Sequence, residues 1–139
     1  MTGAGGFLGV HLVRGLAAAG ADVTGLVRRP VDAATRVFLT PVASRVTWHE
    51  GDVTDRPGMA ELLGGGVDVV VHAAAVTATP RQERDAPARV FDVNAGGTLN
   101  LLEAVRRSPP RRFVLGSSGG LYGPAPPAPA LDETAPLRG

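Results

Sequence analysis

Three glycines at the start of the chain, Gly3, Gly6 and Gly9, constrain its fold more than any other feature. Directly after them, apolar residues recur at the spacing of one helix face, namely Leu8, Leu12, Leu16 and Ala19. Glycines at this spacing allow a tight turn, a close approach of the backbone to a bound group, and close packing of the helix that follows. The unpaired amides at the start of that helix favour an anion such as a phosphate. The sequence therefore predicts a phosphate-binding turn leading into a helix, which Gly20 ends.

Apolar, β-branched runs alternate with helical patterns along the rest of the chain. We expect helices at 7–19, 56–63 and about 84–107, and strands at 21–27, 45–49, 67–71 and 112–115. A Pro/Ala-rich segment at 123–129 should be a loop. This alternation predicts an α/β fold with a parallel sheet covered by helices on both faces. Ligands of such folds bind beyond the carboxyl ends of the strands.

Charge and composition exclude several classes of protein. The 139 residues carry a net charge of +1, which gives no field for attracting nucleic acid. No apolar run approaches the ~20 residues that a membrane span needs. The chain has no Cys, so we expect no disulfide and no thiolate metal site, and it has no Lys, which excludes a P-loop. We expect one cytoplasmic domain over residues 1–139 without a metal, a membrane or a nucleic-acid partner.

Five blocks of sequence, in order and at matching spacing, resemble the motifs of the extended short-chain dehydrogenases/reductases, the nucleotide-sugar epimerase/dehydratase group. The blocks are Thr2 to Gly9, Gly51 to Asp55, Val70 to Ala75, Asn94 to Ala104 and Phe113 to Gly123. The resemblance covers essentially the whole chain. It implies a Rossmann-type, doubly wound parallel sheet with helices on both faces, which binds a nicotinamide dinucleotide.

The resemblance also implies which residues contact the cofactor. Together with the end of the second strand, the expected cofactor-binding residues are Gly3, Gly5, Gly6, Phe7, Leu8, Gly9, Arg28, Asp52, Val53, Ala73, Ala74, Ala75, Asn94 and Ser117. Asp52 would accept a hydrogen bond from the adenine amino group, although an Asp at this place can also simply form a turn. Asn94 would organise the active-site region through hydrogen bonds, the alternative being a solvent-facing side chain. Gly96 and Gly97 each cost a helix about 1 kcal/mol, which predicts close packing against the sheet.

The choice between NAD and NADP depends on the end of the second strand. Enzymes that use NAD usually have an acidic residue there, whereas an Arg can accommodate a 2′-phosphate. Arg28 stands at this place, with Arg29 beside it, and the nearest acidic residue is Asp32. We therefore expect NADP or NAD as the cofactor, with NADP favoured. The alternative is a solvated Arg at a strand end.

Ser118 is the candidate catalytic residue. It lies four residues before Tyr122, the spacing of the active-site serine in the resembling family, where its hydroxyl would polarise a substrate oxygen. The alternative is a serine that caps a turn. The resemblance places the general acid in a Tyr-x-x-x-Lys pair, and Tyr122, the only Tyr, has no Lys to pair with. His72 is expected to be a buried structural residue rather than an acid or base.

Only Met1 and Thr2 precede the glycine turn, so the usual first strand, which is central in such sheets, is lacking. We expect a fragment of a longer protein, with open strand edges and marginal stability. The fragment should be inactive alone, because the Tyr-x-x-x-Lys pair and the substrate-binding C-terminal part are absent.

The main hypothesis is an NAD(P)-dependent oxidoreductase, epimerase or dehydratase acting on a nucleotide sugar or a related carbonyl or alcohol, with a homodimer for the full-length protein. The alternative is a non-catalytic NAD(P)-binding redox sensor or scaffold. A Tyr-x-x-x-Lys sequence beyond Gly139 would favour the enzyme. A methyltransferase on a similar sheet fits less well, because it would leave the serine block unexplained.

Overall fold

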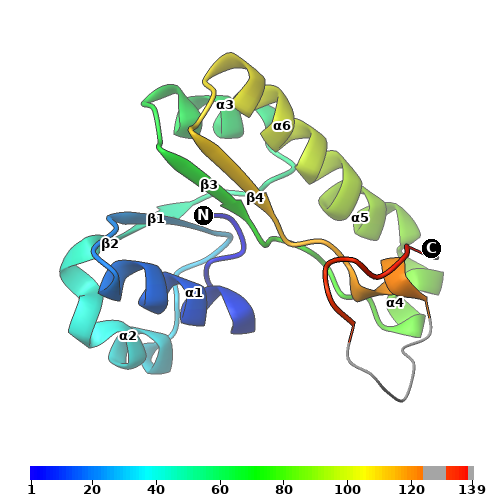
Figure 1. Cartoon of the computed structure of the whole chain (residues 1–139), viewed down its shortest axis with the longest axis horizontal. Helices are drawn as coiled ribbons and strands as arrows, with labels where there is room; N and C mark the ends of the chain where they lie inside the picture. The colour runs from blue at the N-terminus through cyan, green and yellow to red at the C-terminus, as the bar shows by residue number, and fades with distance from the viewer. Residues whose placement is uncertain (124–130, 138–139) are drawn as a thin grey trace.

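A computed structural model of the chain describes residues 1–123 and 131–137 and shows two parallel strand pairs with helices packed against them (Figure 1). The strands are β1 (Val23–Val27), β2 (Val46–Glu50), β3 (Val69–His72) and β4 (Arg112–Leu115). β1 pairs with β2, and β3 pairs with β4, each in parallel register. Every expected strand is present, and no strand end lies more than two residues from its expected position.

Met1 and Thr2 join the two strand pairs through backbone hydrogen bonds. The Met1 amino group donates to the Thr24 carbonyl at 2.7 Å, and the Leu26 amide donates to the Met1 carbonyl at 2.8 Å. On the other side, the Thr2 amide donates to the Val71 carbonyl at 2.9 Å. The order across the fold is therefore β2, β1, Met1–Thr2, β3, β4. This is the order of a doubly wound Rossmann-type sheet, with two residues at its centre.

Helices cover both faces of this sheet. They are α1 (Phe7–Ala18), α2 (Ala33–Leu39), α3 (Arg56–Gly64), α4 (Pro80–Asp85), α5 (Pro87–Phe91) and α6 (Gly97–Arg107), with short 3-10 turns η1 (Thr40–Arg45) and η3 (Gly119–Tyr122) and a π turn, η2 (Asp92–Gly96). The Rossmann-type α/β fold expected from the sequence is confirmed. None of the described helices is long and apolar enough to cross a bilayer.

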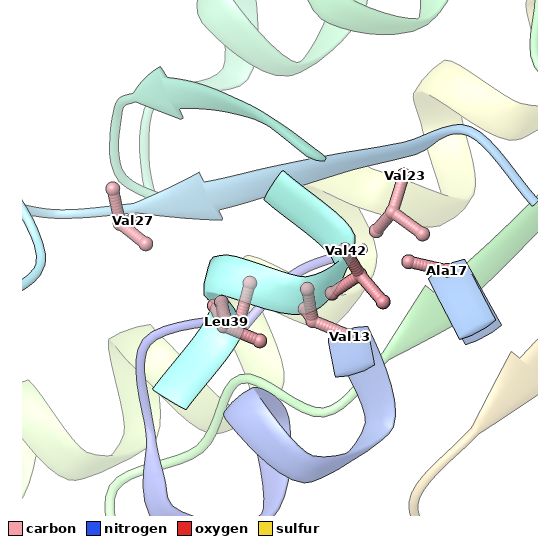
Figure 2. Close-up of a cluster of buried hydrophobic side chains, with 7 residues drawn as sticks. Val13, Ala17, Val23, Val27, Leu39 and Val42 are labelled. Atoms are coloured by element: carbon pink, nitrogen blue, oxygen red, sulfur yellow. The ribbon is translucent and has the colours of Figure 1, made fainter. Parts of the chain in front are cut away.

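The alternation of side chains along β1 divides the core into two layers. Val23 and Val27 point to one face and pack with Val13 of α1 and Leu39 of α2, as Figure 2 shows. Leu26 points to the other face and joins the cluster that contains Met59 of α3 and Leu101 and Ala104 of α6. Because successive residues of a strand face opposite sides, one strand can bind both helical layers.

The prediction of one long helix at about 84–107 is wrong in detail. The chain forms α4, α5, η2 and α6 there instead. The break falls at Ala86, whose φ of −148° and ψ of 54° are not helical. Pro87 follows, and the residue before a proline is disfavoured in the helical region. α2 and η1 were not anticipated from the sequence.

Of the two glycines expected to pack closely, Gly97 does and Gly96 does not. A Cβ at Gly97 would lie 2.5 Å from Val53 Cγ2, so α6 rests against the segment after β2. A Cβ at Gly96 would have no neighbour within 4 Å. Most of the loop expected at 123–129 lies outside the described residues.

Across residues 1–123 and 131–137, no group of His, Asp and Glu side chains is placed to hold a metal ion.

The packing of the core predicts that two leucines of α6 contribute very differently to the free energy of unfolding. Leu101 is 1% exposed and Leu99 is 62% exposed. Leu101→Ala should lower the free energy of unfolding by about 2–5 kcal/mol, because it leaves a cavity in the core. Leu99→Ala, the matched control, should change it by less than about 0.5 kcal/mol. Urea titration monitored by circular dichroism measures both, and equal losses would contradict this packing.

Candidate functional site

The described residues enclose a cavity of about 490 Å³ beyond the carboxyl ends of β1, β2 and β3. Its volume lies within the usual range of small-molecule sites, about 300–1,000 Å³. Nine of the expected cofactor-binding residues line it, namely Gly3, Gly5, Gly6, Arg28, Asp52, Val53, Ala73, Ala74 and Ala75. The structure therefore brings residues from four separate sequence blocks to one place.

The glycine turn forms one wall of the cavity. Gly3 has a φ of 66°, and a Cβ there would lie 2.6 Å from the carbonyl carbon and oxygen of Ala73. A Cβ at Gly9 would overlap the Gly3 carbonyl oxygen and come within 2.9 Å of the Ala4 backbone. The backbone of the turn therefore contacts the segment after β3 on one side and α1 on the other, at positions where a larger residue has no room.

The start of α1 is open to an anion. Its N-cap residue, Gly6, makes no side-chain cap, and the first turn has no acidic residue. In contrast, Asp32 and Asp55 cap α2 and α3 with their carboxylates. The first-turn amides of Phe7 and Leu8 have no acceptor within the helix, and the helix dipole makes this end positive. The side chains of Phe7 and Leu8 are 88% and 60% exposed and, like Gly9, lie outside the cavity lining.

The segment after β3 forms the facing wall, and hydrogen bonds fix it at two points. The Ala74 amide donates to Thr2 Oγ1 at 3.2 Å. Two residues on, the Asn94 side chain accepts from the Val76 amide at 2.7 Å and donates to the Val76 carbonyl at 3.0 Å. Asn94 thus holds the wall from behind rather than lining the cavity, an arrangement that suits the organising role expected of it.

His72 is buried behind the same wall and does not line the cavity. Its Nδ1 lies 2.6 Å from Thr2 Oγ1, and its Nε2 lies 2.9 Å from Thr98 Oγ1. Burial lowers the pKa of His72 below its ordinary value. The imidazole is therefore neutral near pH 7 and occupied on both nitrogens.

The loop after β1 lines the end of the cavity nearest α2. Arg28 and Arg29 are exposed there, and neither forms an ion pair with any described residue. Asp32 also lines the cavity, but its Oδ1 accepts from the Thr35 amide at 2.7 Å. This hydrogen bond lowers the pKa of the Asp32 carboxyl, which keeps the group ionised. Two free cations and one engaged anion thus share this end.

Asp52 shows both of the properties that its sequence position allows. Its Oδ1 accepts from the amide and the hydroxyl of Thr54, each at 3.0 Å, and so forms a turn. The same residue lines the cavity beside Val53. Asn100 of α6 stabilises this turn, because its side-chain amide donates to the Val53 and Thr54 carbonyls at 3.1 Å.

Ser117 and Ser118 follow β4 and are exposed outside the cavity lining. Ser118 caps η3, and its Oγ accepts from the Gly120 amide at 3.1 Å. Accepting this bond uses a lone pair of the oxygen and leaves its proton available for donation. The capping role and a donor role are therefore compatible.

Several lining residues were not anticipated from the sequence, namely Leu26, Val27, Pro30, Val31, Asp32, Thr35, Gly51, Val76 and Val93. Some could have been found. Asp32 is a preferred helix-capping residue four positions after Arg28, so a helix beginning close to the end of β1 could have been expected. Val93 lies in the π turn η2, which the sequence pattern does not predict.

A doubly wound parallel sheet with a glycine turn and a cavity at its carboxyl edge defines a Rossmann-type nucleotide-binding domain. The model of the NAD dependent epimerase/dehydratase family matches residues 1–138, and the chain belongs to this family. The resemblance seen in the sequence is confirmed.

Among curated relatives, UDP-glucose 4-epimerase of Lacticaseibacillus casei is 32% identical, over 96% of this chain and 39% of its own length. A dTDP-4-dehydro-6-deoxy-D-allose reductase of a Streptomyces species is 36% identical, over 96% of this chain and 41% of its own. Sterol demethylase protein B of Methylococcus capsulatus is 37% identical, over 88% and 35%. The chain thus spans roughly 35–41% of the length of these relatives.

Solved structures agree with this assignment. A UDP-glucose-4-epimerase from Stenotrophomonas maltophila with bound NAD matches with a TM-score of 0.81 and 27% identity, over 99% of this chain and 41% of that one. A dTDP-glucose 4,6-dehydratase from Streptomyces venezuelae, also with NAD bound, matches with a TM-score of 0.78 and 31% identity, over 99% and 44%.

The glycine turn predicts opposite effects for one substitution at two sites of α1. Gly9→Ala should lower the free energy of unfolding by about 1–3 kcal/mol, because its Cβ overlaps the backbone of the turn. Gly15→Ala should raise it by about 0.5–1 kcal/mol, because a Cβ there meets nothing within 4 Å and alanine favours the helix. Thermal unfolding measures both, and shifts in the same direction would contradict the geometry of the turn.

Proposed function

We propose that the full-length protein is an NAD(P)-dependent oxidoreductase, epimerase or dehydratase that acts on a nucleotide sugar or a related carbonyl or alcohol. The observation that carries this proposal is the cavity between the glycine turn and the Ala73–Val76 segment, into which no side chain of the turn projects. The epimerase, reductase and dehydratase relatives act on nucleotide sugars by name, and the sterol relative is the reason for the broader substrate class.

The residues present suit a dinucleotide. The open amides of the first turn of α1 would hold the diphosphate, with Gly3, Gly5 and Gly6 allowing its approach. Asp52 and Val53 would contact the adenine, and Ala73 to Ala75 would lie along the cofactor beside β3. When bound, the nicotinamide would accept or return a hydride. The protein would supply orientation and a donor to the substrate oxygen.

The alternative, a non-catalytic redox sensor or scaffold, has less support. The relatives named above are enzymes, and the Ser118 proton is free for donation. We also propose that the 139-residue chain alone binds cofactor without turnover, because its single Tyr has no Lys to pair with. Turnover by this chain alone would contradict that.

We further propose a preference for NADP(H) over NAD(H). Arg28 and Arg29 line the cavity and are exposed, and neither is engaged by a described acidic residue. The carboxylate nearest to them along the loop, that of Asp32, is occupied by its helix cap. A guanidinium can pair with a 2′-phosphate, which NAD lacks.

Arg28→Asp in the full-length protein should lower the affinity for NADP(H) relative to NAD(H) by about 10–100-fold, the range that corresponds to about 1.5–3 kcal/mol for a hydrogen bond to a charged group. Arg111→Asp makes the same change of charge at an exposed site before β4, at the opposite edge of the sheet, and should leave the ratio unchanged. Calorimetric titration measures both ratios. An unchanged ratio in Arg28→Asp would refute this preference.

Ser118 is the residue that we propose polarises the substrate oxygen. Because its Oγ accepts from the Gly120 amide, the hydroxyl is held in a fixed place with its proton free. Ser118→Ala in the full-length protein should lower kcat by about 10²–10³-fold, as the loss of one preorganised donor does in other enzymes. Ser44→Ala, at an exposed site on η1, is the control. Steady-state kinetics that show a lower kcat for Ser118→Ala, with unchanged cofactor affinity, would support the assignment. An unchanged kcat would contradict it.

We also propose that the full-length protein forms a homodimer. It is supported by exposed apolar side chains on neighbouring helices, Phe91 of α5 at 68% and Leu102 of α6 at 43%. Sedimentation equilibrium distinguishes a dimer from a monomer.

A further inference from the structure

We propose that His72, held as the neutral Nε2–H tautomer between two threonine hydroxyls, is a positioning residue that fixes the distance between the two walls of the cofactor cavity. This inference rests on the proposed function, because it takes the cavity to be a dinucleotide site. It concerns a buried ionisable side chain that contacts neither the cavity nor the candidate catalytic serine.

The protons can be assigned from one end of the network to the other. Thr98 Oγ1 donates its only proton to the Asn94 carbonyl at 2.6 Å. At the 2.9 Å contact with His72 Nε2, Thr98 can therefore only accept, so Nε2 carries a proton. This assignment comes from Thr98 alone and requires no assumption about the histidine.

The other half of the network fits the same state. A neutral imidazole with a proton on Nε2 has a lone pair on Nδ1, which accepts from Thr2 Oγ1 at 2.6 Å. Having given its proton to His72, Thr2 Oγ1 accepts from the Ala74 amide at 3.2 Å. Each group donates once and accepts once, and no buried side-chain polar atom of the described residues lacks a partner. Burial lowers the pKa of His72, which favours the same neutral form.

The network connects the two points that fix the Ala73–Val76 wall. One end is the Ala74 amide on Thr2, the residue that enters the glycine turn. The other end is Asn94, whose backbone accepts from Thr98 and whose side chain binds Val76 on both its amide and its carbonyl. His72 lies midway in this network. It connects Thr2, which is 70 positions earlier in the sequence, to Thr98 of α6.

The spacing of the walls is tight enough for this connection to matter. The turn and the wall approach so closely that a Cβ on Gly3 would lie 2.6 Å from the Ala73 carbonyl. A shift of a few tenths of an ångström between Thr2 and Ala74 would therefore alter both the turn and the cavity beside it. Removing either hydroxyl leaves a buried ring nitrogen without a partner, which favours such a shift.

The test compares substitutions that keep shape with substitutions that keep the hydroxyl. In the full-length protein, Thr2→Val and Thr98→Val preserve the side-chain shape and should each weaken dinucleotide binding by about tenfold, which corresponds to 1.4 kcal/mol. Thr2→Ser and Thr98→Ser lose the methyl group but keep the hydroxyl, and should retain wild-type affinity. A packing role alone would predict the reverse order.

Thr40→Val is the matched control for Thr98→Val. Thr40 Oγ1 donates to the Arg36 carbonyl four residues back, as Thr98 does to Asn94, but it is exposed and away from the cavity. The dissociation constant of the Thr40→Val variant for the dinucleotide should equal that of the wild type. Binding is measured by the fluorescence of NADPH and NADH.

A second measurement does not depend on cofactor binding or on the stability of the valine variants. Nitrogen NMR of the ¹⁵N-histidine-labelled full-length protein should show His72 with an unprotonated Nδ1 and a protonated Nε2 at neutral pH. The opposite tautomer or a doubly protonated ring would overturn the proposal, as would wild-type affinity in both valine variants. If the wild type binds neither dinucleotide, the proposed function fails, while the tautomer still decides whether the network is as described.

Discussion

The backbone contact between the glycine turn and the end of β3 is the constraint on which the rest of the site depends. Thr2 hydrogen-bonds to Val71, and the next residue, Gly3, turns so tightly against Ala73 that no side chain fits between them. This contact sets the direction in which α1 leaves the sheet. It also places the open end of that helix beside the carboxyl ends of the strands, where a negatively charged ligand gains from both the free amides and the dipole.

The two-layered core explains how the contact is maintained. Val23 and Val27 on one face of β1 and Leu26 on the other attach separate helical layers to the same strand. Met1 and Thr2 then hydrogen-bond to β1 on one side and β3 on the other, so both strand pairs are aligned from the centre. The loops that follow β1, β2 and β3 consequently meet at one edge. Arg28, Asp52 and Ala73 therefore line one cavity although they are far apart in sequence.

Much of the fold could be predicted because it depends on local patterns. The β-branched run at β3, the helix that begins at Phe7 and its end at Gly20, which has a positive φ, each follow from the residues at those places. Prediction was weaker where distant contacts decide the structure. The division of the helix at 84–107 results from Pro87 and from a π turn stabilised by Thr98 and Asn94, whose partners lie on β3 and after it.

In the candidate site, too, the features set by local sequence could be predicted and those set by distant contacts could not. The glycines and the strand-end residues predict a nucleotide-binding cavity, because their spacing reflects backbone geometry. The arrangement behind the wall was not predictable, because Thr2, His72 and Thr98 become neighbours only when the sheet forms. His72 was expected to be buried and structural, yet nothing in the sequence indicated that it would link the turn to α6. Ser117 and Ser118 follow the family pattern, but neither lines the cavity.

The central claim is that the first turn of α1 holds a diphosphate, and amide NMR of the full-length protein tests it most directly. On titration with NADPH or NADH, the account predicts that the backbone amides of Gly6, Phe7 and Leu8 show the largest changes in ¹H–¹⁵N chemical shift. The amides at Gly15 and beyond on the same helix should change little. Saturable binding that leaves Gly6 to Leu8 unperturbed, or no binding of either dinucleotide, would contradict it.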